Sequence, residues 1–408
     1  FSTGGTSATL NTSLDIARIL LNATPTFSIG ASGGSTLTLQ GENLSGVNTG
    51  ITAAMPWLVG SGSYTLSAPL ILGADQSWNV SNGSGPTTLV VSGSISGSGR
   101  GLTKIGNGTL ALAGASTYSG TTTVSGGTLE LRAGASLAGG VSVAAGTTLG
   151  LANAFTSSLN VGSIVSGSGN VAVTGGGAVR LANAGNTFSG ATSVTAGTLV
   201  ISDPAALGNG TTPIVVSGPA DDNTFSGQNR SQLGGQLLVA SGSGVALGRD
   251  LALAGAGVRG ISGRNVSAVN YPGGNWHGGY ALQSIGNNTI SGAVTTATTT
   301  TIVSSQFGLL TLAGAVTGSG GGTANLYLAG GGNIAMTGAV GPAAIQLRSG
   351  NTLILTNTAN TIGSIASVGV ARLRVGSGNV LANTLFFSPG TVLEMRVAAG
   401  EVASFGTS

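Results

Sequence analysis

The chain has few side chains that could perform acid–base chemistry. It contains one histidine and ten carboxylates among 408 residues. Two of the carboxylates, Asp221 and Asp222, are adjacent, and on a strand they would point to opposite faces. The surrounding PADDNTFSGQ is typical of a turn, where acidic side chains are solvated. A polysaccharide hydrolase or lyase, which needs two facing carboxylates, is therefore kept only as an alternative that this spacing does not support.

Other reaction classes lack the necessary residues. A Ser/His/Asp triad would have to use His277, and no serine lies in a nucleophile-elbow motif. The only lysine, Lys104, follows Thr103, so no phosphate-binding loop is present. Cysteine is absent, zinc ligands are too few, and the turns lack the aspartates of calcium-binding repeats. The sequence predicts no enzyme, no cofactor and no metal site.

One segment, residues 245–284, differs from the rest of the chain because arginine and aromatic residues concentrate there. Such side chains can stack on sugars or anchor a protein contact, and loops that leave a repetitive scaffold often carry binding. The alternative is that these aromatics pack back onto the body of the protein. The candidate contact residues are Arg259, Arg264, Tyr271, Trp276, His277 and Tyr280.

In the segments that would position such a loop, apolar residues recur at every second position. Leu110 and Leu112 flank Ala111, and Leu129 and Leu131 flank Glu130. This alternation predicts strands with one buried face. Charged residues take the outward positions of these and similar segments, namely Glu130, Arg180, Arg372, Arg374, Glu394 and Arg396.

The strands recur at a nearly constant interval. Leu110 to Leu129 is 19 residues, Leu129 to Leu149 is 20, and Leu149 to Val171 is 22. One strand-and-turn phrase repeated in one direction predicts an all-β, right-handed parallel β-helix, rather than an antiparallel sandwich. About 20 coils at a spacing of about 4.8 Å would give a rod on the order of 90 to 100 Å.

The first 30 residues are expected to form a separate cap on a solenoid of residues 31–408. TSLDIARILLN (12–22) has a capping residue, an acidic first turn and a proline beyond its end. These features predict a short helix that covers the open end of the first coil. The alternative is that this helix reaches a neighbouring molecule. The C-terminal stretch shows no equivalent cap, so another subunit or further sequence could continue the stack.

Composition limits the partners of the protein. Charged residues make up 6% of the chain and the net charge is +3, which is too sparse to bind a nucleic-acid backbone. No apolar run reaches the roughly 18 residues of a membrane-spanning helix.

The residues SGSISGSGRGLTKIGNGTLALAGASTYSGTTTVSGGTLEL (92–131) resemble the autotransporter-associated β-strand repeat. A second copy is more divergent: NTFSGATSVTAGTLVI (186–201) aligns with residues 116–131 at a shift of 70, and the lysine of the pattern is missing. The resemblance implies the passenger of an autotransporter, secreted to the surface of a Gram-negative bacterium. It brings no catalytic residues.

These observations lead to two functional hypotheses. The first is a non-enzymatic surface protein that acts as a stalk, coat or self-assembling filament and contacts its own copies through the ends and sides of the solenoid. The second is an adhesin that binds glycans or a host protein through residues 245–284.

Overall fold

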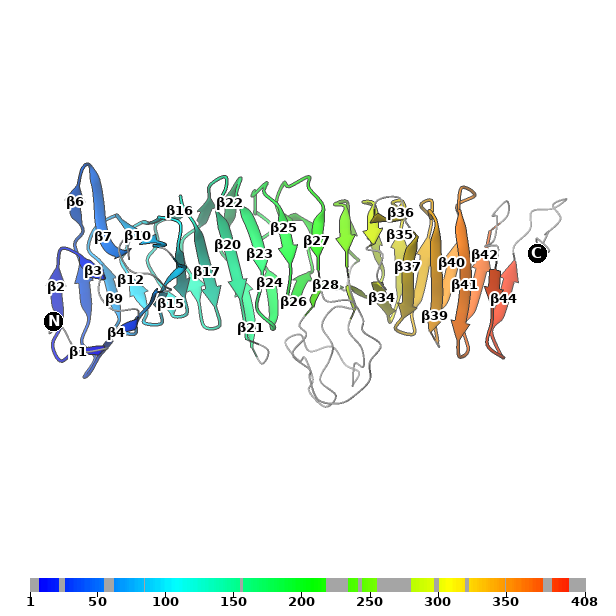
Figure 1. Cartoon of the computed structure of the whole chain (residues 1–408), viewed down its shortest axis with the longest axis horizontal. Helices are drawn as coiled ribbons and strands as arrows, with labels where there is room; N and C mark the ends of the chain where they lie inside the picture. The colour runs from blue at the N-terminus through cyan, green and yellow to red at the C-terminus, as the bar shows by residue number, and fades with distance from the viewer. Residues whose placement is uncertain are drawn as a thin grey trace. The chain divides into compact units, whose positions relative to one another are not determined.

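The computed structural model describes residues 7–21, 26–54, 62–83, 85–154, 157–217, 234–240, 244–254, 280–296, 301–319, 323–348, 350–376 and 384–395. These residues form a parallel β-solenoid of about 14 turns with almost no helix, as predicted for the fold class. Two compact units are distinguished, one of residues 1–191 with 205–210 and one of residues 192–204 with 211–408. Figure 1 shows the strands within each unit lying side by side.

The first unit is built on three sheets, whose strands pair with the equivalent strands of the next coil. Sheet A contains β1 (Ser7–Leu10), β4 (Thr26–Ala31), β8 (Gly62–Leu66), β11 (Thr87–Val91), β14 (Thr109–Leu112), β17 (Thr128–Arg132), β20 (Thr148–Ala152) and β23 (Asn170–Val173). Sheet B contains β2 (Leu14–Ile16), β5 (Leu37–Leu39), β9 (Leu70–Leu72), β12 (Ile95–Ser96), β15 (Ala115–Ser116) and β18 (Ser136–Leu137). Sheet C contains β3 (Ile19–Leu21), β7 (Val47–Ala54), β10 (Gln76–Ser81), β13 (Leu102–Ile105), β16 (Thr122–Val124), β19 (Val141–Val143) and β22 (Val165–Gly167). Strands β21 (Ser158–Val161) and β24 (Ala178–Leu181) pair with each other.

The second unit also has three parallel ladders of strands. Sheet D contains β26 (Gly197–Ile201), β28 (Gly235–Ala240), β31 (Leu282–Ile285), β34 (Thr301–Gln306), β37 (Ala324–Ala329), β39 (Ala343–Arg348), β41 (Ile362–Val368) and β43 (Thr384–Phe386). A second parallel ladder of this unit consists of β25 (Thr192–Val194), β27 (Ile214–Val216), β30 (Leu251–Leu253), β33 (Val294–Thr296) and β36 (Val316–Gly318). Sheet F contains β29 (Ala246–Leu247), β32 (Asn288–Ile290), β35 (Leu309–Leu312), β38 (Asn333–Met336), β40 (Thr352–Leu355), β42 (Arg372–Val375) and β44 (Val392–Met395). The one 3-10 helix of the described ranges is η1 (Pro204–Leu207).

The core consists of in-register columns of aliphatic side chains. Leu110 pairs with Leu129, Leu129 with Leu149, and Leu149 with Val171. All four are completely buried. The predicted spacing of 19, 20 and 22 residues is therefore confirmed as one coil per interval. The outward charges are confirmed as well, since Glu130, Arg180, Arg372, Arg374 and Glu394 all reach solvent. Arg396 lies outside the described residues.

The predicted N-terminal helix is wrong. Within residues 12–22 the chain forms the strands β2 and β3. Leu14 pairs with Leu37 in sheet B, and Ile19 pairs with Ile51 in sheet C. A helix of this length is marginal by itself, so the backbone hydrogen bonds and the apolar contacts of the neighbouring coil outweigh the helix-capping pattern.

The predicted number of about 20 coils is also wrong, because the described residues form about 14 turns. The difference arises where long segments separate consecutive strands. Residues 217–234 lie between β27 and β28, and residues 254–281 lie between β30 and β31. The right-handed sense of the coil, which parallel connections favour, stays a prediction.

The turn before β17 explains the repeated Gly-Thr-Leu triplet. Gly127 has a φ of 61°, and a Cβ atom on it would lie 2.3 Å from the carbonyl oxygen of Gly108 in the preceding coil. Only glycine satisfies both the left-handed backbone and this close approach. The turns can therefore stack directly on each other.

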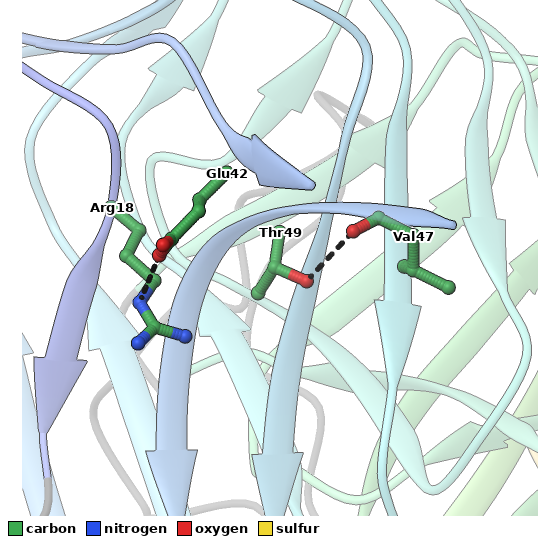
Figure 2. A network of polar contacts seen from close by, with 4 residues as sticks. All are labelled: Arg18, Glu42, Val47 and Thr49. Atoms are coloured by element: carbon green, nitrogen blue, oxygen red, sulfur yellow. Dashed lines mark hydrogen bonds and ion pairs between the residues drawn. The ribbon is translucent and has the colours of Figure 1, made fainter. Parts of the chain in front are cut away.

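A hairpin departs from the parallel pattern near the start of the chain. Strand β6 (Glu42–Leu44) pairs antiparallel with β7, and the turn residues Ser45 and Gly46 have φ values of 52° and 87°. Positive φ at both turn positions matches the twist of a two-residue hairpin. Figure 2 shows its base, where Arg18 Nε lies 2.7 Å from Glu42 Oε2.

Candidate functional site

The predicted contact segment, residues 245–284, is only partly described. Arg259, Arg264, Tyr271, Trp276 and His277 lie outside the described residues. Tyr280 lies just before β31 and is 8% exposed. Burial raises the pKa of the Tyr280 hydroxyl above its ordinary value. Tyr280 is therefore buried within the second unit. The contact role of residues 245–284 stays a prediction.

Arg249 belongs to the same segment and is buried at a corner of the coil. Its Nε donates a hydrogen bond to the carbonyl oxygen of Thr212 at 2.8 Å, and its Nη1 donates to Thr192 Oγ1 at 3.2 Å. Burial lowers the pKa of the guanidinium, which stays charged because arginine ionises far above neutral pH. Its position between residues of consecutive coils makes it a bridge that holds those coils together.

A buried strip of polar side chains lies on the outer face of sheet D. Leu237 and Leu282 point into the core, so the preceding Gln236 and the following Gln283 point away from it. Thr198 Oγ1 donates to Gln236 Oε1, and Gln236 Nε2 donates to Gln283 Oε1, each at 2.9 Å. All three side chains are at least nine-tenths buried. This strip was not predicted from the sequence. The two glutamines, Gln236 and Gln283, each stand next to a leucine of the alternating pattern, and this is the signal that could have indicated it.

Several exposed aromatic and apolar side chains belong to the later coils of the second unit. The Arg348 guanidinium lies 4.9 Å from the centre of the Tyr327 ring, which is a cation–π contact. Val370 and Phe386 are 60% and 65% exposed. Tyr327 and Arg348 also reach solvent.

Lys104 is completely buried inside the first unit. It stands in an interior column between Trp78 and Val124. Its Nζ donates to three backbone carbonyl oxygens, those of Ile105 at 2.9 Å, Gly106 at 2.7 Å and Gly126 at 2.9 Å. Burial lowers the pKa of the ammonium to about 8. This lysine therefore caps turn carbonyls of two coils and is not available as a nucleophile.

Tyr118 and Thr122 form a second buried polar contact a few residues later. The two hydroxyl oxygens are 2.7 Å apart, and neither side chain is exposed. Burial raises the pKa of Tyr118 to about 12, and the hydrogen bond to Thr122 lowers it by less. The tyrosine hydroxyl thus satisfies a threonine that points into the core.

Comparison with known families assigns these interior residues to a repeated motif. The family model of the passenger-associated-transport-repeat matches residues 102–131 and 172–201. The chain carries two passenger-associated-transport-repeats. The first match begins two residues before Lys104 and contains Tyr118, and the second contains Phe188 at the position of Tyr118. The resemblance to an autotransporter passenger with repeats is therefore confirmed.

The two passenger-associated-transport-repeats satisfy the same buried threonine in different ways. In the first, Tyr118 holds Thr122. In the second, the tyrosine is replaced by Phe188, which has no hydroxyl, and Arg249 donates to the corresponding Thr192. Because a buried hydroxyl without a partner is costly, the loss of one donor is compensated by another from a later coil.

No curated protein and no solved structure shows a significant match to the chain. Across the described ranges, no three residues among histidine, cysteine, aspartate and glutamate are grouped to hold a metal ion. Within the same ranges, no helix has the length and apolar composition that crossing a bilayer requires.

Proposed function

We propose that the protein is the secreted passenger of an autotransporter and acts as a non-enzymatic structural β-solenoid, a stalk or coat, on the surface of a Gram-negative cell. The two repeats support the secreted setting, since the matching family is defined by passenger transport. The parallel ladders support a mechanical role, because each coil adds backbone hydrogen bonds to the next along the stack.

The observation that carries the structural role is the use of the carboxylates. Asp15 accepts a hydrogen bond from Gln40 Nε2 at 2.9 Å, and Asp75 accepts one from the backbone N–H of Gly101 at 2.9 Å. Asp250 accepts one from the N–H of Ala293 at 2.7 Å. Each partner lies one coil further along the chain. These three carboxylates therefore hold adjacent coils together, while Asp221 and Asp222 lie outside the described residues.

The location is tested by treating intact cells of the source bacterium with a protease. We expect an antibody against the chain to lose its signal, while a periplasmic marker protein is retained. Retention of both signals until the outer membrane is permeabilised would contradict surface display.

The mechanical role is tested by electron microscopy of the purified protein over a range of concentrations. A weakly charged surface favours association of copies, so we expect bundles or end-to-end filaments as the concentration rises. Separate particles at every concentration would contradict a coat of associated copies and leave a stalk of single copies as the proposed role.

A further inference from the structure

Most exposed large apolar side chains in the described part of the second unit lie along one edge, where the backbone turns from sheet D into sheet F. Phe307 follows β34, and Val370 lies between β41 and β42. Val368 and Phe386 are the last residues of their sheet D strands, and Val392 is the first residue of β44. These five residues are between 45% and 68% exposed, and we call them the apolar edge.

Phe307 holds an unfavourable backbone conformation on this edge. Its φ is 53°, in the left-handed region where a Cβ atom crowds the backbone. Gln306 pairs with Ile285, so Phe307 stands where the preceding coil has Gly286, whose φ is 84°. The corresponding turns of later coils also have glycine at positive φ, namely Gly331, Gly350, Gly369 and Gly390. Phe307 is 68% exposed, so burial within the chain does not offset the strain, and a strained, exposed aromatic side chain points to an external contact.

Two exposed arginines flank the apolar edge. Arg348 pairs in register with Val368, and Arg372 pairs in register with Val392. No aspartate or glutamate occurs among residues 251–393, so no acidic side chain of this stretch neutralises the two arginines. The apolar edge therefore lies in a positive potential, which attracts an anionic partner.

The N–H donors of both arginines are available to such a partner. The Arg348 guanidinium lies 4.9 Å from the centre of the Tyr327 ring, a contact that positions the side chain without using its donors. Arg372 forms no ion pair with another described residue. Arg374, by contrast, is already paired, because its Nε lies 2.8 Å from Glu394 Oε2. Guanidinium groups with available donors bind phosphate oxygens well.

We propose that the apolar edge binds an anionic lipid surface. The phenylalanine and valine side chains enter the boundary between headgroups and acyl chains, while Arg348 and Arg372 bind lipid phosphates. The edge is convex, because the backbone turns there from one sheet to the next, so its side chains reach a membrane before the flat faces of the sheets do. The edge follows the stack of coils, so binding lays this part of the coil axis along the membrane.

A second copy of the chain and an acidic polysaccharide are the competing occupants. If two copies met edge to edge, their arginines would face each other without acidic residues between them, which is unfavourable. An acidic polysaccharide would satisfy the arginines, but it offers the valine side chains no hydrocarbon to enter. A lipid surface supplies anionic groups and hydrocarbon at adjacent depths.

The test measures cosedimentation of the purified chain with vesicles of phosphatidylcholine alone and with vesicles of equal parts phosphatidylcholine and phosphatidylglycerol. The apolar variant combines Phe307→Gly, which suits the positive φ, with Val370→Thr, which keeps the β-branched shape. Its matched control combines Leu20→Thr with Val215→Thr, two exposed apolar residues of other strands.

A second pair of variants separates the position of the charges from their number. The charge variant combines Arg348→Gln with Arg372→Gln. Its control combines Arg100→Gln with Arg180→Gln, two exposed arginines of the first unit, and changes the net charge equally.

We expect the natural chain to bind the anionic vesicles, and to bind them more weakly as the salt concentration rises. The apolar variant and the charge variant should each bind about tenfold more weakly, while both controls keep the natural affinity. The thermal midpoint of the apolar variant should not fall, because glycine relieves the strain at position 307.

Absence of binding to the anionic vesicles, equal binding to phosphatidylcholine alone, or equal losses in the controls would each overturn the proposal. Binding that is unchanged in the apolar variant and is displaced by polygalacturonate would assign the arginines to an acidic polysaccharide. Dimers of the natural chain that dissociate only in the apolar variant would assign the edge to a second copy. A lower thermal midpoint of that variant would contradict the strain argument. Surface display, tested separately by protease treatment of cells, does not depend on these results.

Discussion

At the scale of single residues, two of the thirteen cationic side chains connect consecutive coils from buried positions. Lys104 and Arg249 are buried cations, and each donates at least one hydrogen bond to another coil. Lys104 donates to the carbonyl oxygen of Gly126, and Arg249 donates to the carbonyl oxygen of Thr212 and the hydroxyl of Thr192. A buried charge is tolerated only when hydrogen bonds replace its hydration. Each cation therefore depends on the coil stacked beside it, and its presence specifies the register of that coil.

The buried Lys104 predicts an unusual dependence of stability on pH. Its pKa is about 8 in the folded chain, against 10.5 for a fully solvated lysine, so between these values the unfolded chain binds more protons. The free energy of unfolding should therefore rise, by about 1 to 3 kcal/mol, as the pH increases from about 8 to 10. Burial raises the pKa of Tyr118 from 10.0 to about 12, so the stability should fall again above pH 10.

Urea denaturation at pH 8, 9 and 10 measures this rise. The matched variant is Lys104→Met, which keeps the length of the side chain and removes the titrating group. Its free energy of unfolding should be nearly constant over the same interval. An identical rise in Lys104→Met would show that another group is responsible.

A buried asparagine gives a second prediction at this scale. Asn186 Oδ1 accepts a hydrogen bond from the N–H of Val165 at 2.8 Å, and its Nδ2 donates to the carbonyl oxygen of Ala206 at 2.7 Å. Asn186→Ala leaves two buried backbone groups without partners and should lower the free energy of unfolding by about 3 kcal/mol. The control is Asn183→Ala, whose hydrogen bonds are exposed and whose cost should stay below about 1 kcal/mol. Equal costs in denaturant titrations would contradict the bridging role.

At the scale of elements, each strand is stabilised mainly by its equivalents in the adjacent coils. Leu129 in β17 is completely buried between Leu110 and Leu149, whereas its neighbour Thr128 faces outward. Leu129→Ala removes the central side chain of this column and should cost about 3 kcal/mol, since a close-packed interior relaxes only partly around a cavity. Thr128→Ala should cost less than about 1 kcal/mol. Thermal unfolding of the two variants compares them, and similar costs would show that the column is not tightly packed.

At the scale of the whole molecule, parallel stacking makes the energetics nearly one-dimensional. A coil contacts its two neighbours, so a local loss of stability should spread over a few coils and then fade. In hydrogen exchange, Leu129→Ala should increase the exchange rates of residues 102–152. The amides of residues 334–375, which belong to the second unit, should exchange as in the natural chain. A uniform increase along both units would instead indicate a single cooperative transition.

The amino-acid sequence by itself determined the strands, their interval and their buried faces, because alternation and turn chemistry are local properties. The column Leu110, Leu129 and Leu149 follows from that alternation alone. Tertiary contacts decided the rest. Residues 14–21 became strands because partners at residues 37 and 51 complete their hydrogen bonds. Lys104 is buried because the carbonyl oxygen of Gly126, one coil later, accepts its hydrogen bond. Thr192 accepts a hydrogen bond from Arg249, which lies 57 residues further along the chain. Such partners are fixed by which coils stack together, and a local pattern does not contain that information.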